Sequence, residues 1–320
     1  MPVALELAVR QILSDVSPAA LEKPGRHLTN LYRSERGTLG AGPLTELQAL
    51  AYVASRMPAT YAAIQKVLLT VHDALPSLAP QTLLDVGSGP GTALWASLHE
   101  FFSLERLMAI ESDQVMRKIG QKIASKSTND VLIGTVWQCE DLYGARLAPC
   151  DLVVASYVMG ELSEDFVLTL TQRLWQATRL ALIIIEPGTP EGFRRIGHIR
   201  TWLLESGAHI VAPCPHDGAC PMKEPDWCHF AVRLARSRVH RQLKGGKAPY
   251  EDEKYSYVAV SRQSLEHQGA RVIRHPFVQP GRVRLDVCTT DGISSELATK
   301  KNPERFRQAR KLSWGDLWTH

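Results

Sequence analysis

The sequence contains no apolar stretch as long as a membrane-spanning helix, because its longest apolar runs have the length of β-strands. It also has no acid-poor leader, since Glu6, Asp15 and Glu22 interrupt the N-terminal region, so we expect neither a signal peptide nor a transit peptide. Internal repeats and low-complexity segments are absent too. We therefore expect a soluble cytoplasmic protein whose six cysteines do not form disulfides.

The composition fits a large globular chain with a slight positive charge. Of the 320 residues, 44% are hydrophobic and 22% are charged, which allows a substantial core in one large α/β domain with additions. The formal net charge of +4 is mild, but the cations are unevenly spread along the chain.

Residues 81–200 alternate between short apolar strands and helical segments. Such alternation predicts a parallel sheet covered by helices on both faces, with ligands bound at the carboxyl ends of the strands. The five predicted strands are Thr82–Val86, Leu107–Glu111, Val131–Trp137, Leu152–Ser156 and Leu180–Glu186.

The regions on either side of this alternation carry their own signals. Residues 1–78 lack strand alternation and are predicted to be helical; Thr45 is a candidate N-cap and Pro58 suits the first turn of the next helix. After residue 200 we expect two more strands, Tyr255–Val260 and Arg282–Cys288, which would return as an antiparallel hairpin beside the fifth strand.

The segment LLDVGSGPGTA, residues 83–93, ends an apolar strand in an acid and then places glycine at every second position. Glycine lets backbone N–H groups approach a ligand that a Cβ would hold off. The spacing is tighter than that of dinucleotide sites and resembles the first motif of S-adenosylmethionine-dependent methyltransferases. We predict that S-adenosylmethionine binds at Asp85, Gly87, Ser88, Gly89 and Gly91.

Three further polar residues are predicted to line the same rim. Glu111 ends the second strand, where an acid suits the hydroxyls of a ribose. Asp141 follows the third strand, where methyltransferases usually contact adenine. Ser156 ends the fourth strand. A helix N-terminal charge for Glu111 and an exposed turn acid for Asp141 are the alternatives. Ser156–Glu161 lacks the Asn-Pro-Pro-Tyr type sequence of amino-group methyltransferases, so no catalytic residue is recognisable.

A cysteine-rich segment, Val211–Phe230, interrupts the pattern with three cysteines, four prolines and two histidines. Its spacing, Cys214-x5-Cys220-x7-Cys228, contains no Cys-x2-Cys pair of the kind that zinc ribbons use. The hairpin prediction makes this segment an insertion between the fifth and sixth strands and allows Cys288 to lie beneath it.

Four thiolates can hold a zinc ion or an iron–sulfur cluster. The prolines directly after Cys214 and Cys220 and the irregular spacing favour a cluster, while His216 and His229 remain possible zinc ligands. The remaining cysteines, at 139 and 150, have no paired base in the sequence and are interpreted as structural thiols.

Cations are concentrated after the cysteine-rich segment, in what we predict to be a basic helix that ends at a Gly-Gly pair. Clustered cations favour phosphate contact, so we predict RNA binding, although a solvated charged face is the alternative. The predicted RNA-binding residues are Arg233, Arg236, Arg238, Arg241, Lys244 and Lys247. The C-terminal region adds further cations together with Trp314 and Trp318, whose rings would suit base stacking.

Taken together, these segments resemble a known family. The runs CPHDGACPM, DWCHF, YEDEKYSYV and LDVCTTDG, together with RMPATY at residues 56–61 and the glycine loop, are similar to the methyltransferase-like proteins associated with the small ribosomal subunit, which include mitochondrial ribosome assembly factors and bacterial relatives. The resemblance covers most of residues 45–290. It implies a [4Fe–4S] cluster on Cys214, Cys220, Cys228 and Cys288, S-adenosylmethionine at the glycine loop, and work on small-subunit ribosomal RNA.

We therefore predict a class I S-adenosylmethionine-dependent methyltransferase fold, α/β with a mostly parallel seven-stranded sheet. The predicted parts are an N-terminal helical region (1–78), a methyltransferase-like domain (79–290) with a Cys-rich metal-binding insertion and basic helix (206–250), and a basic C-terminal tail (291–320). The expected protein is cytoplasmic, bacterial and ribosome-associated, and it binds small-subunit ribosomal RNA and no membrane. The sequence does not fix its oligomeric state, for which a monomer is favoured. An active ribosomal RNA methyltransferase and a cluster-bearing redox or iron sensor are the alternatives.

Overall fold

The computed structural model describes residues 1–33, 42–244, 248–266 and 269–319. The chain divides into two compact units. Unit 1 comprises Met1–Ile184 and Val232–Glu253, and unit 2 comprises Ile185–Ala231 and Lys254–His320. No helix among the described residues is both long and apolar enough to span a bilayer.

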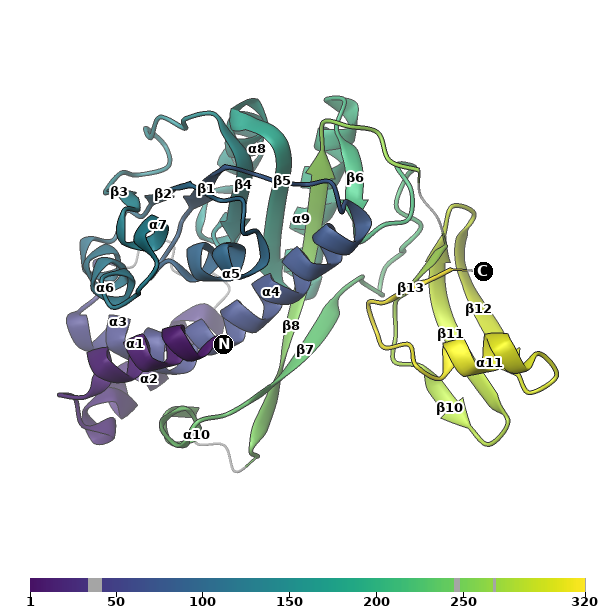
Figure 1. Ribbon diagram of the computed structural model, residues 1–320, viewed down its shortest axis with the longest axis horizontal. Coiled ribbons are helices and arrows are strands. Elements are labelled where there is room, and N and C mark those ends of the chain that lie inside the picture. Colours follow the sequence, from purple (N-terminus) through teal and green to yellow (C-terminus); the bar gives the residue numbers. More distant parts are fainter. Residues whose placement is uncertain (34–41, 245–247, 267–268, 320) are drawn as a thin grey trace. The chain divides into compact units, whose positions relative to one another are not determined.

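Unit 1 begins with four helices, as the sequence predicts: α1 (Val3–Leu13), α2 (Pro18–Arg33), α3 (Glu46–Ser55) and α4 (Met57–Ala74). The predicted cap of α3 is confirmed, because the Thr45 side chain accepts a hydrogen bond from the Gln48 N–H and Gln48 reaches back to the Thr45 backbone. The predicted place of Pro58, in the first turn of α4, is confirmed as well. Helix α4 packs against α5 (Thr92–Glu100) (Figure 1).

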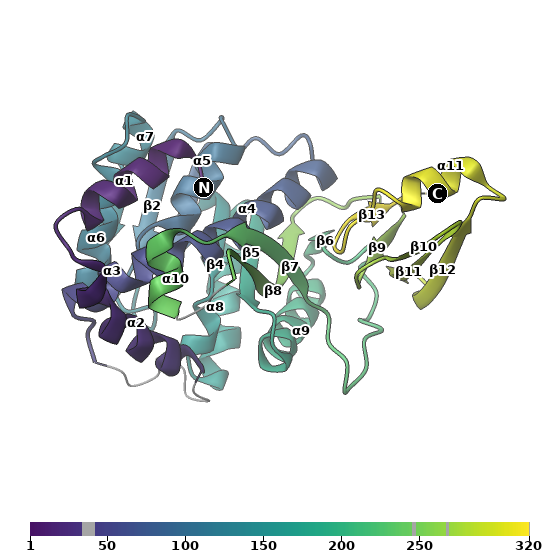
Figure 2. The ribbon, with the colours of Figure 1, turned by 90° about the horizontal axis from the view of Figure 1, so that it is seen from below.

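The alternating part of unit 1 follows the predicted order. Strands β1 (Thr82–Val86), β2 (Arg106–Ile110) and β4 (Cys150–Ser156) pair in parallel, with β1 between the other two. Helix α6 (Gln114–Ala124) follows β2 and α8 (Glu164–Ala177) follows β4. Figure 2 shows α5 and α8 on opposite sides of this sheet, so the prediction of helices on both faces is confirmed.

The third strand is shorter than predicted. Val131 lies in a helical turn, α7 (Asp130–Ile133), and β3 spans only Val136–Gln138. The cause is local, because the Asn129 side chain accepts hydrogen bonds from the Val131 and Leu132 N–H groups and so begins a helix.

The main sheet has the strand order β3-β2-β1-β4-β5-β8-β6, with β7 paired to β8. The strands not yet given are β5 (Thr178–Pro187), β6 (His209–Ala212), β7 (Phe230–Ala235) and β8 (Tyr250–Ser261). Strands β6 and β8 run antiparallel, which is the closing hairpin expected for the class I methyltransferase fold. The predicted partner strand was wrong, however, because β6 and not Arg282–Cys288 pairs with β8.

Unit 2 contains helix α9 (Pro190–Glu205) and a second, five-stranded sheet. Its strands are β9 (Ala270–Val272), β10 (Phe277–Gln279), β11 (Arg282–Thr289), β12 (Gly292–Thr299) and β13 (Leu317–Trp318), and α11 (Pro303–Ala309) follows β12. Apolar residues of β9, β11 and β12 form its core with Ala309 and Trp318, and Phe306 and Leu312 pack against that core.

Residues 291–320, predicted as a tail, therefore include two strands and a helix of this sheet. Alternation explains why β12 belongs to it: Ala298 is buried opposite Val283, whereas Leu297 is exposed opposite Arg284. The cysteine-rich segment lies between β6 and β7, so the predicted insertion between the fifth and sixth strands was displaced by one strand.

Candidate functional site

The glycine loop has the predicted strand–turn–helix geometry. It joins β1 to α5, and its three glycines all adopt a positive φ, 66° at Gly87, 55° at Gly89 and 81° at Gly91. These values lie in the left-handed region that side chains with a Cβ rarely adopt. A turn within the loop is closed by the Gly91 N–H, which donates to the Ser88 carbonyl at 2.8 Å.

Two of the glycines differ in what surrounds them. A Cβ at Gly87 would lie 2.3 Å from Cγ2 of Val158, so this glycine makes room for a side chain of the protein itself. A Cβ at Gly89 would have no heavy atom within 4 Å. Gly89 is therefore the glycine that faces open space, where a ligand can approach the backbone.

Glu111 fastens this loop to the end of β2. Its two carboxylate oxygens accept hydrogen bonds from the Gly89 N–H at 2.7 Å and the Asp113 N–H at 2.8 Å. Burial raises the pKa of Glu111, and these backbone donors act in the opposite direction. The predicted residue thus lies beside the loop, and each of its oxygens keeps a further lone pair for a ligand.

Three buried polar side chains near the loop have atoms without hydrogen-bond partners in the described part of the chain. The atoms without partners are the two carboxylate oxygens of Asp85, the hydroxyl of Ser88 and the hydroxyl of Thr92. Burial, followed by the charge of Glu111, raises the pKa of Asp85 to about 8. Buried polar groups in folded proteins normally have partners, so this cluster suits a polar ligand.

The other two predicted cofactor residues are less engaged. Asp141 is exposed, and its side chain accepts a hydrogen bond from the Tyr143 N–H at 2.9 Å, which is a local turn. Ser156 is half-buried at the end of β4. Their roles stay predictions.

The sequence did not reveal the backbone at Tyr157, directly after β4. Its φ is 59°, and it is the one residue other than glycine with a positive φ in the described part of the chain. Such conformations cost free energy and concentrate at functional sites. The only sequence signal was its place at the carboxyl end of β4, the rim where catalytic groups of such folds lie.

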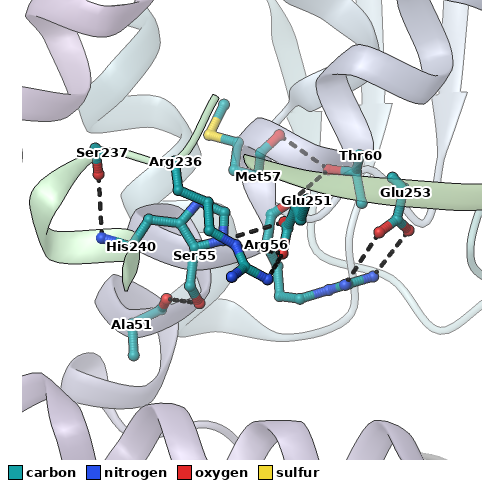
Figure 3. Close-up of polar contacts among 10 residues, drawn as sticks. All are labelled: Ala51, Ser55, Arg56, Met57, Thr60, Arg236, Ser237, His240, Glu251 and Glu253. Carbon is teal, nitrogen blue, oxygen red and sulfur yellow. Dashed lines mark hydrogen bonds and ion pairs between the residues drawn. The ribbon is translucent and has the colours of Figure 1, made fainter. Parts of the chain in front are cut away.

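Two residues of α3 and its C-terminal end face the same rim. The pKa of Tyr52 is raised to about 12, mainly by burial. The charge of Arg56 acts against this rise, and the charges of Glu161 and Glu111 add to it. The guanidinium group of Arg56 pairs with Glu253 of β8 at 3.3 Å (Figure 3). Arg56, the first residue of the RMPATY run, is therefore held by β8 near Tyr52 and Tyr157.

A second site lies wholly in unit 2, where all four predicted metal ligands line one cavity of about 40 Å³. By that measure the cavity has room for a few water-sized groups. Its sulfur-bearing lining residues are Cys214, Cys220, Cys228, Cys288 and Met222. Cys288 reaches the cavity from β11 of the second sheet, although its predicted strand partner was wrong.

Burial is the main cause of the raised pKa at three of these thiols. It raises the pKa of Cys288 to about 12 and that of Cys228 well above its usual range, and the neighbouring cysteines add to both shifts. The pKa of Cys214 is raised as well, with Arg200 acting against the rise. The neighbouring cysteines affect one another in this way because they line the same cavity.

Two buried arginines border the cavity without a carboxylate partner in any ion pair of the described residues. Arg200 donates to the carbonyls of His216 at 3.1 Å and Gly218 at 2.7 Å. Arg271 donates to the carbonyls of Pro213 at 2.7 Å and Gly315 at 2.9 Å. These contacts hold the cysteine-rich segment in place and leave two positive charges beside the thiols.

The described residues show no metal-ligand geometry. Within the described ranges, no group of three or more His, Cys, Asp or Glu side chains is arranged so that it could hold a metal ion. Nε2 of His216, a predicted alternative ligand, lies 3.8 Å from Cys288 Sγ. The shared cavity is therefore shown, whereas the predicted metal-binding insertion is not.

The predicted basic helix is only partly helical. Arg233 lies in β7, and Nε and Nη2 of its guanidinium group donate to the two carboxylate oxygens of Asp252, at 2.7 and 2.8 Å. Arg236 pairs with Glu251 at 2.9 Å, and His240 lies 3.1 Å from the same acid (Figure 3). These arginines are neutralised by β8, which weakens the case for phosphate contact there.

The helix begins later, as α10 (Arg238–Lys244), and packs against α2 and α3 (Figures 1 and 2). Arg238 and Arg241 are exposed on it, and Lys244 is its last residue. Lys247 lies outside the described residues.

The two tryptophans predicted to stack on bases differ in burial. Trp318 is buried in the core of the second sheet. Trp314 is half-buried and makes edge contacts with His229 and His275, each with ring centroids 4.8 Å apart. The prediction of base stacking was therefore wrong for Trp318, whose ring serves packing, and stays a prediction for Trp314.

The family model described as mitochondrial small ribosomal subunit Rsm22 matches residues 46–319. The ribosome assembly protein METTL17, mitochondrial, of Homo sapiens is 28% identical over 85% of this chain, which spans 63% of that protein. The Rsm22-cox11 tandem protein 2, mitochondrial, of Schizosaccharomyces pombe is 28% identical over 86% of this chain, which spans 43% of that protein.

Among solved structures, the magnesium protoporphyrin IX methyltransferase of Synechocystis PCC 6803 is similar, with 13% identity, a TM-score of 0.44, and coverage of 75% of this chain and all of that one. A methyltransferase from Aquifex aeolicus has 16% identity, a TM-score of 0.42, and coverage of 69% and 100%. The curated relatives are mitochondrial proteins, so the predicted cytoplasmic, bacterial localisation is overturned.

Proposed function

Because the chain belongs to the family described as mitochondrial small ribosomal subunit Rsm22, we propose that it acts on the small ribosomal subunit as an RNA-contacting assembly protein built on a methyltransferase fold. The family match over residues 46–319 is the observation that carries this proposal, because it includes the glycine loop, the cysteine cavity and the second sheet. Three parts of the proposal have separate support.

The first part is S-adenosylmethionine at the glycine loop. Its support is the open space at Gly89 and the buried, partnerless oxygens of Asp85, Ser88 and Thr92. A ligand with a positively charged sulfonium and ammonium suits a site with two acids, Asp85 and Glu111. In this proposal Glu111 holds the loop in shape and offers its remaining lone pairs to ribose hydroxyls.

The second part is a [4Fe–4S] cluster held by the four cysteines, with zinc as the alternative. A cluster ligated by four thiolates is anionic, which fits the two buried guanidinium groups of Arg200 and Arg271. Because Cys214, Cys220 and Cys228 lie in one segment and Cys288 in β11, a bound cluster would tie that segment to the second sheet. Its proposed contribution is stability of unit 2.

The third part is that methyl transfer is not the main activity. The rim after β4 has no recognisable proton-transferring or amine-holding sequence, and Val158 packs on Gly87 there. An active ribosomal RNA methyltransferase remains the second candidate, favoured by the positive φ of Tyr157 at the same rim.

One experiment tests this function and separates the two candidates. Purified chain is mixed with small ribosomal subunits and with methyl-labelled S-adenosylmethionine, and both co-sedimentation and label in the ribosomal RNA are measured. We expect co-sedimentation without label. Label in the RNA would make the protein a methyltransferase, and failure to co-sediment with mature subunits or their precursors would contradict the proposed function.

A further inference from the structure

The strongest concentration of positive charge outside the predicted basic helix follows β12. Residues 300–311 contain six cations and one acid, Glu304, which gives this stretch a formal charge of +5. The stretch comprises the turn after β12, helix α11 and the turn that follows it.

These residues surround a surface hollow of about 580 Å³, a size suited to a nucleotide. We call it the α11 hollow, and its lining residues are Lys300, Pro303, Phe306, Arg307, Arg310 and Lys311. Phe306 is its aromatic element, half-buried because it packs against the core of the second sheet, and the guanidinium carbon of Arg310 lies 5.8 Å from the centre of its ring. Among the residues that the structure describes, no acid lines the hollow.

The cations of the α11 hollow differ from their neighbour Arg305. Arg305 is neutralised by Glu296 at 3.0 Å and lies over the Trp318 ring at 4.5 Å. In the described part of the chain, no ion pair involves Lys300, Arg307, Arg310 or Lys311, and all four are exposed. One arginine of α11 therefore serves the fold, while the hollow's cations remain available to an external anion.

We infer that the α11 hollow binds the phosphate backbone of single-stranded RNA. This inference rests on the proposed function. In it, the α11 hollow takes the place of the ion-paired Arg233 and Arg236 as the surface that contacts phosphate. Arginine forks and lysine ammonium groups are the side chains that phosphates attract, and a ring beside them offers a face to a base. An acidic protein partner fits less well, because protein interfaces are anchored by apolar groups and only Pro303 and Phe306 supply them here.

A charge-matched pair of variants tests the inference. Arg307→Gln with Lys311→Gln removes two charges from the hollow, and Arg282→Gln with Arg284→Gln removes two exposed charges from β11, whose side chains alternate with the buried Val283. Binding of a single-stranded oligonucleotide of small-subunit ribosomal RNA and of a glutamate-rich peptide of equal charge is measured over a range of salt concentrations.

We expect the hollow variant to bind the RNA roughly tenfold more weakly at physiological salt and to reduce the log–log salt slope by about 1.4, twice the value of about 0.7 for one phosphate on a single strand. The β11 variant should change both far less. Equal losses in both variants, or a hollow variant that binds like the wild type, would overturn the hollow alone. A wild-type chain that binds no RNA would overturn the RNA contact of the proposed function too, and tighter binding of the peptide would assign the hollow to an acidic protein.

Discussion

At the scale of single residues, Asp85 carries the clearest chemical signal. It is the penultimate residue of the buried strand β1, its carboxylate has no hydrogen-bond partner in the described part of the chain, and its pKa is raised to about 8. A buried carboxylate without a partner lowers the stability of the folded protein when it is ionised. Proteins tolerate this cost where the group binds a ligand. The sequence located this residue, whereas only the structure shows its isolation.

This isolation predicts a specific pH dependence of stability. The folded-state pKa of Asp85 lies above its unfolded value of 3.8, so folded protein holds the proton between pH 3.8 and about 8 while unfolded protein has lost it. The contribution of Asp85 to the free energy of unfolding is therefore fully present below pH 3.8 and is lost as the pH rises to about 8.

Urea unfolding at several pH values checks this expectation. Asp85→Asn should flatten the fall in stability toward pH 8, whereas Asp130→Asn, at an exposed acid of α7, should leave the slope unchanged. A wild-type slope that survives in Asp85→Asn would mean that this carboxyl ionises in the folded protein as it does in water.

At the scale of elements, the strands that local pattern specifies were predictable and the pairings between distant strands were not. Strands β1, β2 and β4 are short apolar runs bounded by polar turns, which sequence alone indicates. Arg282–Cys288 was a correct strand in the wrong sheet, because alternation specifies a buried face without naming the neighbour that covers it. The acids that neutralise Arg233 and Arg236 lie in β8, 19 and 15 residues further along the chain, so the charge run alone could not reveal them.

The glycine loop yields a prediction at this scale, because its glycines serve different neighbours. Gly89→Ala lowers the free energy of unfolding only by the cost of a left-handed backbone at alanine, roughly 1–2 kcal/mol. Gly87→Ala has the same backbone cost and also forces Val158 to move, since the new Cβ would lie 2.3 Å from Cγ2 of Val158. We therefore expect Gly87→Ala to lower the free energy of unfolding more than Gly89→Ala, and Val158→Ala to recover part of the loss.

Urea unfolding measures the stabilities, and calorimetry with S-adenosylmethionine measures the affinities. The methyl group of Gly89→Ala enters the open space, so affinity should fall in a variant that remains stably folded. If Gly89→Ala binds S-adenosylmethionine as the wild type does, the open space at Gly89 is not where the cofactor meets the loop.

At the scale of the whole molecule, the chain combines a methyltransferase-type sheet with a second sheet. The second sheet and the cysteine cavity both belong to unit 2. The sequence predicted the four cysteines as one set, and the structure brings them to one cavity. It could not predict that Arg200 and Arg271 would lie beside them, since their contacts are with backbone carbonyls far along the chain. These arginines are the feature that favours the proposed anionic cluster.

The central claim is that these four thiols hold a cluster that the ribosomal role requires, and metal and sulfide analysis of anaerobically purified protein tests it most directly. We predict about four irons and four sulfides per chain in the wild type and in Cys139→Ser, whose thiol is exposed and outside the cavity. Cys288→Ser should lose iron and sulfide as completely as Cys214→Ser and should no longer co-sediment with small subunits. Stoichiometric zinc without sulfide, or full iron retained in Cys288→Ser, would contradict the account.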